Sequence, residues 1–354
     1  MYHLNSRKTV STGASIMACL LASCAAATGS SALPAASTAA GSPSEEASPQ
    51  PSIDAGGLVG RIAFMRGDPS READVTYTVD PAGSHEQQLF SEGNSGFPTW
   101  SPDGTEIHVF CCGDGMVAHF VDPATGEVVR ALPPPDPSLE IFCGGSWSPD
   151  GRRISCEGFG VEDSSLNGVY TVRASDGGGL RRITSNPDGF DAPGDFSPDG
   201  QRLVFTRFVD DEPVGVFVTE LDGSGLVQIS PPDLVLDDTG FAGSWSPDGR
   251  QILFVTRAAE DQHKEIWIVG SDGSSPRPFE MTPACGGSFS DASSAGCYSP
   301  EWSPDGSMIV FTRSSPDGET ENIYIVNADG TGLRQVTDGG ADDNADWGTP
   351  PGDR

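Results

Sequence analysis

The stretch Trp245-Ser246-Pro247-Asp248-Gly249 recurs along the chain with little variation. Successive copies begin 45 to 57 residues apart, and the residues between them are mostly strand formers separated by turn signals. A repeat of this length and composition is typical of a β-propeller, in which each copy forms one blade. The aromatic residues that begin the copies are Trp100, Trp147, Phe196, Trp245, Trp302 and, in a degenerate last copy, Trp347.

Each copy predicts four strands. Pro presets φ for a tight turn and Gly takes the left-handed position, so Ser-Pro-Asp-Gly joins the aromatic strand to the next one. That next strand has an alternating pattern, as in 252–254, which predicts a half-buried strand. An aromatic or β-branched third strand, as in 266–268, ends at an Asp-Gly hairpin signal such as Asp272-Gly273, and a polar fourth strand follows. The sequence therefore predicts an all-β fold, a six-bladed β-propeller with four antiparallel strands per blade.

With these motifs the chain resembles the TolB-type propeller, which is built from the Ser-Pro-Asp-Gly form of the WD-like repeat. The resemblance covers residues 58–349 and implies the fold of that domain. A TolB protein also has a small α/β domain before its propeller, whereas the corresponding part of this chain has the composition of a linker. The partner contacts of TolB are therefore not implied here.

The phase of the repeat predicts how the ring closes. The first copy begins with its second strand, at Arg61, and lacks an aromatic strand, while the last copy supplies an aromatic strand around Trp347 and then stops. We expect these two ends to form one blade, so that neither end of the propeller leaves an unpaired sheet edge.

The N-terminal residues have the pattern of a lipoprotein signal peptide, predicted over residues 1–23. Arg7 and Lys8 precede an apolar stretch that is too short to span a bilayer, and Leu21-Ala22-Ser23-Cys24 resembles the lipobox in which the cysteine becomes the acylated first residue. A plain signal peptide is the alternative. Residues 24–57, rich in Ala, Ser and Pro, predict a disordered tether, and residues 350–354 a short tail. We expect an exported protein held at the membrane or cell surface by its lipid anchor alone.

The chain is strongly acidic, with 20 Lys and Arg against 51 Asp and Glu and a formal net charge of −31. Such a surface excludes nucleic acid as a partner and favours a basic protein, a cation or simple solubility. Acidic residues collect in the connections that lead into the aromatic strands, which we expect on the face with the variable loops. The candidate binding residues are Asp191, Asp195, Asp237, Asp238, Asp342 and Asp343, and solvated loops are the alternative.

Six cysteines remain after Cys19 and Cys24 are set aside, an even number that fits an oxidising compartment. Cys285 and Cys297 lie in the one long insertion and predict a local disulfide. Cys143 and Cys156 flank one turn motif, and Cys111 and Cys112 belong to the neighbouring blade, so the pairing among these four stays open. The ligand spacing of a zinc site is absent, and we predict no metal site.

Catalytic signals are weak, because the chain has no Gly-x-Ser-x-Gly elbow and its five histidines are scattered. The sequence therefore predicts a monomeric, lipid-anchored propeller that binds an unidentified envelope protein or ligand without a cofactor. The alternative is a hydrolase or lyase that uses carboxylates, with Ca²⁺ as its cation, since oxygen ligands suit a hard cation.

Overall fold

The structure is a computed structural model that describes residues 58–68, 70, 73–90, 94–112, 118–237, 243–258, 263–281, 285, 296–315 and 318–350. Of residues 94, 95, 111 and 112 it describes the backbone alone. The predicted signal peptide, Cys24, the tether, Asp238, tail residues 351–354 and the side chains of Cys111 and Cys112 lie outside this part of the chain. The predictions made for them stay predictions.

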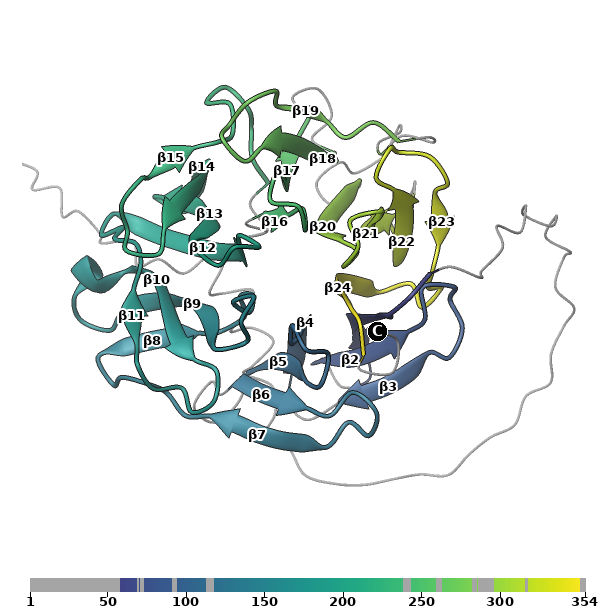
Figure 1. Cartoon of the computed structure of the whole chain (residues 1–354), viewed down its shortest axis with the longest axis horizontal. Coiled ribbons are helices and arrows are strands. Elements are labelled where there is room, and N and C mark those ends of the chain that lie inside the picture. Colours follow the sequence, from purple (N-terminus) through teal and green to yellow (C-terminus); the bar gives the residue numbers. More distant parts are fainter. Residues whose placement is uncertain are drawn as a thin grey trace, which may run out of the picture.

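Six four-stranded antiparallel sheets stand in a ring, as Figure 1 shows, and each sheet is one blade. Blade 1 contains β24 (Asp342–Gly348), β1 (Arg61–Asp68), β2 (Ala73–Val79) and β3 (Gln87–Phe90). Blade 2 contains β4 (Asn94–Trp100), β5 (Ile107–Cys112), β6 (Ala118–Val121) and β7 (Val128–Leu132). Blade 3 contains β8 (Leu139–Phe142), β9 (Arg153–Gly160), β10 (Gly168–Arg173) and β11 (Arg181–Arg182), with a 3₁₀ turn at Ser164–Leu166.

The second half of the ring repeats this order. Blade 4 contains β12 (Gly189–Phe196), β13 (Arg202–Val209), β14 (Glu212–Glu220) and β15 (Val227–Gln228). Blade 5 contains β16 (Ser244–Trp245), β17 (Gln251–Arg257), β18 (Lys264–Gly270) and β19 (Arg277–Pro278). Blade 6 contains β20 (Cys297–Trp302), β21 (Met308–Ser314), β22 (Glu321–Asn327) and β23 (Arg334–Gln335). The strand that leads to the repeated aromatic residue stands at one end of the order in every sheet, and β4, β16, β20 and β24 lie near the axis of the ring in Figure 1. We call these end strands the innermost strands.

The Ser-Pro-Asp-Gly turns have the predicted geometry. In the copy at Ser246, the Gly249 N–H donates to the Ser246 carbonyl at 2.8 Å, and Gly249 has a φ of +72°. The Ser246 hydroxyl donates to Asp248 Oδ1 at 2.7 Å. The same side-chain bond occurs in the other four full copies, so these aspartates serve the turn.

The ring closes as the phase of the repeat predicts. Strand β24 pairs with β1 in antiparallel register, with Trp347 opposite Ile62 and Asp343 opposite Met65. The last strand of the chain thus becomes the innermost strand of the first blade. The prediction of a six-bladed propeller closed by its N- and C-terminal strands is confirmed.

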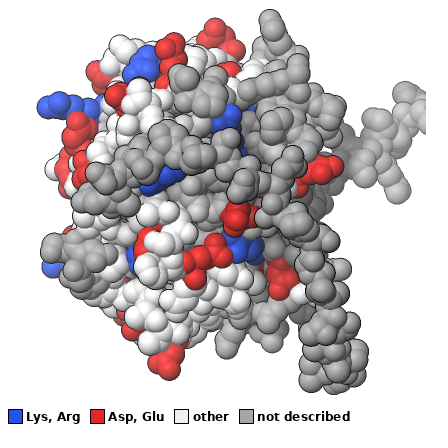
Figure 2. All heavy atoms as spheres, turned by 90° about the vertical axis from the view of Figure 1, so that its right-hand side faces the viewer, with Lys and Arg blue, Asp and Glu red and all other residues white. Residues whose placement is uncertain are grey.

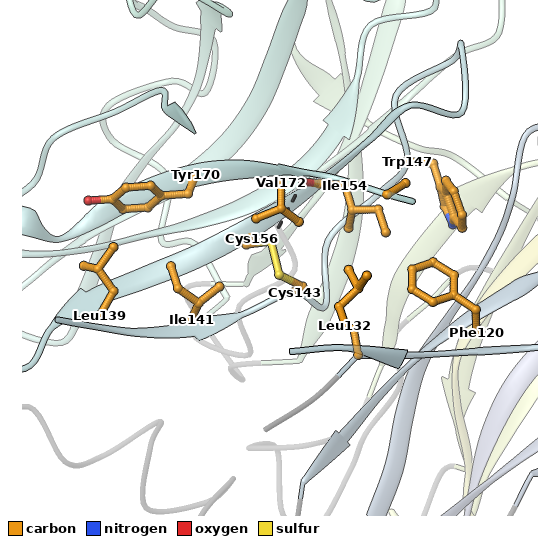
Figure 3. Packing of buried hydrophobic residues seen from close by; sticks show 12 residues of the cluster. Phe120, Leu132, Leu139, Ile141, Cys143, Trp147, Ile154, Cys156, Tyr170 and Val172 are labelled. Atoms are coloured by element: carbon orange, nitrogen blue, oxygen red, sulfur yellow. Dashed lines mark hydrogen bonds between the residues drawn. A yellow bond between two sulfur atoms is a disulfide. The ribbon is translucent and has the colours of Figure 1, made fainter. Parts of the chain in front are cut away.

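The hydrophobic core lies between neighbouring blades, and the six repeated aromatic side chains are all buried in it. One cluster joins Phe120 and Leu132 of blade 2 to Ile141 and Ile154 of blade 3, with Trp147 packed edge-on against Phe120 (Figure 3). Because each sheet is covered on both sides, strands such as β17 bury residues on both faces, with Leu253 as hidden as Phe254. The expectation of half-buried second strands is wrong for this reason.

Among the described residues, no helix is long and apolar enough to cross a membrane.

Candidate functional site

Three of the predicted binding aspartates are buried ion-pair partners. Asp191, at the beginning of β12, accepts two hydrogen bonds from Arg207, at 2.7 and 2.8 Å. Asp342 is held in the same way by Arg66, and Asp237 lies 3.1 Å from Arg257 Nε. The side chains of Asp191 and Asp342 are 0% exposed and that of Asp237 2%, so the expectation that these carboxylates are free loop groups is wrong.

The missed signal is the arginine near the end of the second strand. Arg66 and Arg207 each come two residues after a buried phenylalanine of that strand, at Phe64 and Phe205. The strand order places the end of the second strand beside the beginning of the innermost strand, where the aspartate stands. Each guanidinium also lies over aromatic rings of its own blade, 5.3 Å from the Phe64 ring for Arg66 and 5.4 Å from the Phe205 ring for Arg207.

Asp343 follows the ion-paired Asp342 and is half-buried. Its Oδ1 accepts a hydrogen bond from the Thr312 hydroxyl of blade 6 at 2.8 Å. Burial raises the pKa of Asp343 to about 6, and the nearby Lys264 ammonium acts against that rise. Lys264 itself is buried, 4.2 Å from the Tyr298 ring centre and 3.8 Å from Asp237. Asp343 therefore belongs to a polar network between blades rather than to an exposed loop.

A second set of acidic side chains stands on the innermost strands, one residue before the repeated aromatic. These are Asp195 on β12, Glu301 on β20 and Asp346 on β24, and we call them the axial carboxylates. The corresponding positions in the other three blades carry Thr99, Ser146 and Ser244. Asp195 was predicted as a loop residue, whereas it is the next-to-last residue of β12. Glu301 was not predicted as a site residue, although its position before the repeated aromatic could have revealed it.

The axial carboxylates connect neighbouring blades. Asp346 Oδ2 accepts a hydrogen bond from the Trp100 N–H at 2.5 Å, and Asp195 Oδ2 accepts one from the Trp245 N–H at 3.1 Å. The Ser244 hydroxyl donates to Glu301 Oε2 at 2.5 Å. All three side chains are half-buried, with part of their surface open to solvent.

Their environment raises the pKa of every axial carboxylate. Burial raises the pKa of Asp195 to about 6 and that of Asp346 to about 7. Burial also raises the pKa of Glu301 well above its usual value, and the charges of Asp195 and Asp346 add to the effect. Like charges in a partly desolvated place disfavour full ionisation. Perturbed carboxyls of this kind mark candidate functional sites.

Among the cysteines whose side chains the structure describes, two disulfides are present, Cys285–Cys297 as predicted and Cys143–Cys156 from the set that was left open. Figure 3 shows Cys143–Cys156 inside the core cluster between blades 2 and 3. Both pairs are consistent with an oxidising compartment.

Two other titratable groups are enclosed. His108 is fully buried, contacts the Thr99 hydroxyl through Nδ1 at 3.2 Å, and has its pKa lowered to about 3 by burial. Glu157 on β9 has a buried Oε1 without a hydrogen-bond partner among the described residues. Burial and the nearby Asp191 raise the pKa of Glu157 to about 8, which keeps this carboxyl protonated near neutral pH.

In the described part of the chain, no three His, Cys, Asp or Glu residues are arranged to hold a metal ion. Two shallow hollows of about 470 and 480 Å³ lie between blades 3 and 4 and between blades 2 and 3. Of the arginines that line them, Arg207 and Arg130 are paired with Asp191 and Glu106, and Arg182 donates to the carbonyl oxygens of Thr184 and Asn167. The hydroxyl and carboxylate that meet in the second hollow, Ser101 and Asp103, form the hydrogen bond of the repeated turn.

The charges on the described surface are mixed. Figure 2 shows one side of the molecule, on which acidic and basic side chains lie close together rather than in separate patches. On that side the acidic side chains form no continuous surface.

Comparisons with known proteins identify relatives of the propeller. No protein-family model matches the chain. It is 26% identical over 232 residues to an uncharacterized protein of Agrobacterium fabrum, covering 61% of this chain and 69% of that protein. It is also 32% identical over 95 residues to the Tol-Pal system protein TolB of Anaeromyxobacter dehalogenans, but this match covers 27% of the chain and 18% of the relative.

Solved structures agree on the fold. TolB from Acinetobacter baumannii superposes with a TM-score of 0.61 at 19% identity, over 81% of this chain and 66% of that one. A TolB-like protein from Agrobacterium tumefaciens gives a TM-score of 0.58 at 18% identity, over 84% and 96% of the two chains. The chain thus has the six-bladed propeller fold found in TolB proteins.

Proposed function

We propose that the protein is an exported, lipid-anchored β-propeller that binds a basic segment of an envelope protein and has no catalysis of its own. The observation that supports this best is the set of axial carboxylates. Asp195, Glu301 and Asp346 keep part of their surface open on the innermost strands, and the charges that act on them are those of one another. A lysine or arginine side chain would relieve this repulsion.

The similarity to TolB supports a role at the cell envelope but identifies no partner. The relative from Anaeromyxobacter dehalogenans is a Tol-Pal system protein, and the match to it covers a short part of each chain. The anchor rests on the sequence around Cys24 alone, with the tether of residues 24–57 holding the propeller away from the membrane. Replacement Cys24→Ser should move the protein from the membrane fraction to the soluble one. Unchanged membrane association would contradict the anchor.

Binding is tested with a probe of known charge. Immobilised oligolysine should capture the protein, and immobilised oligoglutamate should not. The triple variant Asp195→Asn, Glu301→Gln, Asp346→Asn should lower oligolysine capture, and added salt should lower capture by the wild type, since exposed charges are screened within about 8 Å at physiological ionic strength. Asp191, Asp237 and Asp342 are left unchanged because these buried carboxylates hold half-buried arginines.

A matched control removes the same number of charges elsewhere. Glu127, Glu162 and Glu280 are exposed and lie away from the innermost strands, so their replacement by Gln should leave capture close to that of the wild type. Equal loss in both triple variants would show that net charge alone attracts the probe, and would overturn the proposed site.

The rival function, a hydrolase or lyase that uses carboxylates, has one observation in its favour. Glu157 is a carboxyl held protonated beside the Asp191–Arg207 pair, as a general acid must be. If the protein cleaves a glycan or peptide from an envelope extract, Glu157→Gln should abolish that turnover, whereas the axial variants should not. A Ca²⁺ requirement for the turnover would add support to this rival.

A further inference from the structure

The Ser244 hydroxyl stands between two carboxyls of different blades. It donates to Glu301 Oε2 of blade 6 at 2.5 Å, and it also lies within interaction range of the Asp195 carboxyl of blade 4. Ser244 itself belongs to blade 5. One side chain therefore connects three consecutive blades next to the axis.

A serine hydroxyl has one proton, and an ionised carboxylate only accepts. If both Asp195 and Glu301 were ionised, Ser244 could donate its proton to only one of them. The oxygen of the other carboxylate would then face the Ser244 oxygen with no hydrogen between them. A single proton on either carboxyl removes the conflict, because that carboxyl then donates to Ser244 while Ser244 donates to its other neighbour. Both contacts are hydrogen bonds only when this extra proton is present.

The surroundings favour the proton. Asp195 also contacts the Ser146 hydroxyl and accepts from the Trp245 N–H, and neither of these partners carries a charge. The charged groups that act on Glu301 are Asp195 and Asp346, both acidic. Asp346 accepts from the Trp100 N–H and is itself influenced by Asp195. Burial raises the pKa of all three carboxyls, and repulsion by neighbouring carboxylates adds to the rise for Glu301 and Asp346.

We propose that Asp195, Ser244 and Glu301 hold a shared proton that ties blades 4, 5 and 6 together at the axis, so that the ring is tighter with the proton than without it. This goes beyond the proposed binding function and does not depend on it. The direction in which stability changes with pH follows from the linkage between protonation and folding. A carboxyl whose pKa is higher in the folded state than in the unfolded state stabilises the fold fully at pH values below its unfolded-state pKa of about 4. That contribution is lost as the pH rises through its folded-state pKa.

The test compares melting temperatures of the wild type and Glu301→Gln between about pH 5 and about pH 9. The amide introduced by this substitution donates to Ser244 Oγ at every pH, so it replaces the shared proton permanently. We expect the variant to gain at least about 2 °C over the wild type as the pH rises across this range. The control Glu280→Gln changes an exposed glutamate and should follow the wild type throughout.

A second measurement needs no variant. Carboxyl carbon NMR of the wild type, assigned through Asp195→Asn and Glu301→Gln, should show one carboxyl of the pair still protonated above about pH 6. In the same sample, the Trp245 and Trp100 amides should exchange faster with solvent as this proton is lost. A pH profile of Glu301→Gln parallel to that of the wild type, or both carboxyls ionised by about pH 5, would overturn the proposal.

Discussion

Arg207 and Asp191 are joined by two parallel hydrogen bonds, Nε to Oδ1 at 2.7 Å and Nη2 to Oδ2 at 2.8 Å, with the carboxylate of Asp191 fully buried. The Thr184 hydroxyl and the Asn186 amide also donate to this carboxylate. The pair fastens the end of β13 to the beginning of β12, and Arg66 with Asp342 does the same in blade 1. Part of the acidic composition is therefore scaffold.

Replacement Asp191→Ala should destabilise the protein strongly. Removing Asp191 leaves the half-buried Arg207 guanidinium without its counter-charge, and breaking a fully buried pair typically costs about 3–5 kcal/mol. Chemical denaturation followed by tryptophan fluorescence measures the loss. Asp188→Ala is the matched control, because Asp188 lies in the same connection and is exposed, and it should change stability by less than about 0.5 kcal/mol. Equal effects of the two substitutions would show that the ion pair is not a structural clamp.

Ring closure predicts the effect of truncation. Removing residues 342–354 deletes β24, which leaves β1 as an unpaired edge and exposes the core residues Ile62 and Phe64. We expect a much lower melting temperature and a tendency to aggregate, measured by calorimetry and light scattering. A chain that ends after Pro350 keeps the whole of β24 and should melt like the full chain. A truncated protein with an unchanged melting temperature would contradict closure through β24.

The sequence predicts the scaffold well because the scaffold is periodic. Five copies of one turn and six copies of one aromatic position determine the number of blades, the strand order and the closing pair, and each depends on local turn chemistry that a single repeat reveals. The pairing of Cys285 with Cys297 was predictable for a similar reason, since both lie in one local insertion.

The site is less predictable, because it depends on contacts between blades. Asp191 and Asp342 look like solvated loop residues in the sequence, and only the strand order brings Arg207 and Arg66 to them. Glu301 and Asp195 are 106 positions apart, and nothing in either repeat alone shows that Ser244 links them. The sequence also does not distinguish the buried aspartates from the exposed ones, because both are the same residue type with the same charge.

Gly348 predicts a packing limit at the closing strand. A Cβ at this position would stand 2.1 Å from the Trp100 ring, which belongs to blade 2, so Gly348 allows the aromatic residue of one blade to rest on the backbone of another. Gly348→Ala should cost about 1–3 kcal/mol through overpacking. Gly67→Ala on the adjacent β1 is the control, since the nearest atom to its Cβ would be 3.6 Å away. The melting temperatures of the two variants test this prediction, and Gly348→Ala should melt lower than Gly67→Ala. Equal melting temperatures would mean that the Trp100 ring moves aside freely.

The two disulfides form a matched pair for the last prediction. Their sequence separations are 13 and 12 residues, so the loss of chain entropy alone would give each about 3 kcal/mol. Their settings differ, because the innermost strand of blade 3 is interrupted. Strand β8 ends at Phe142, and Trp147 meets Ile154 through an isolated bridge.

Cys143–Cys156 lies within that interruption, in the core cluster between blades 2 and 3, and joins the two strands where their hydrogen-bond ladder is missing. We therefore expect the double replacement of Cys143 and Cys156 by Ala to lower the melting temperature more than the same replacement of Cys285 and Cys297. The difference should appear in hydrogen exchange as faster opening of β8 and β9. Equal losses from the two double variants would show that both disulfides act through chain entropy alone and that the interrupted strand needs no support.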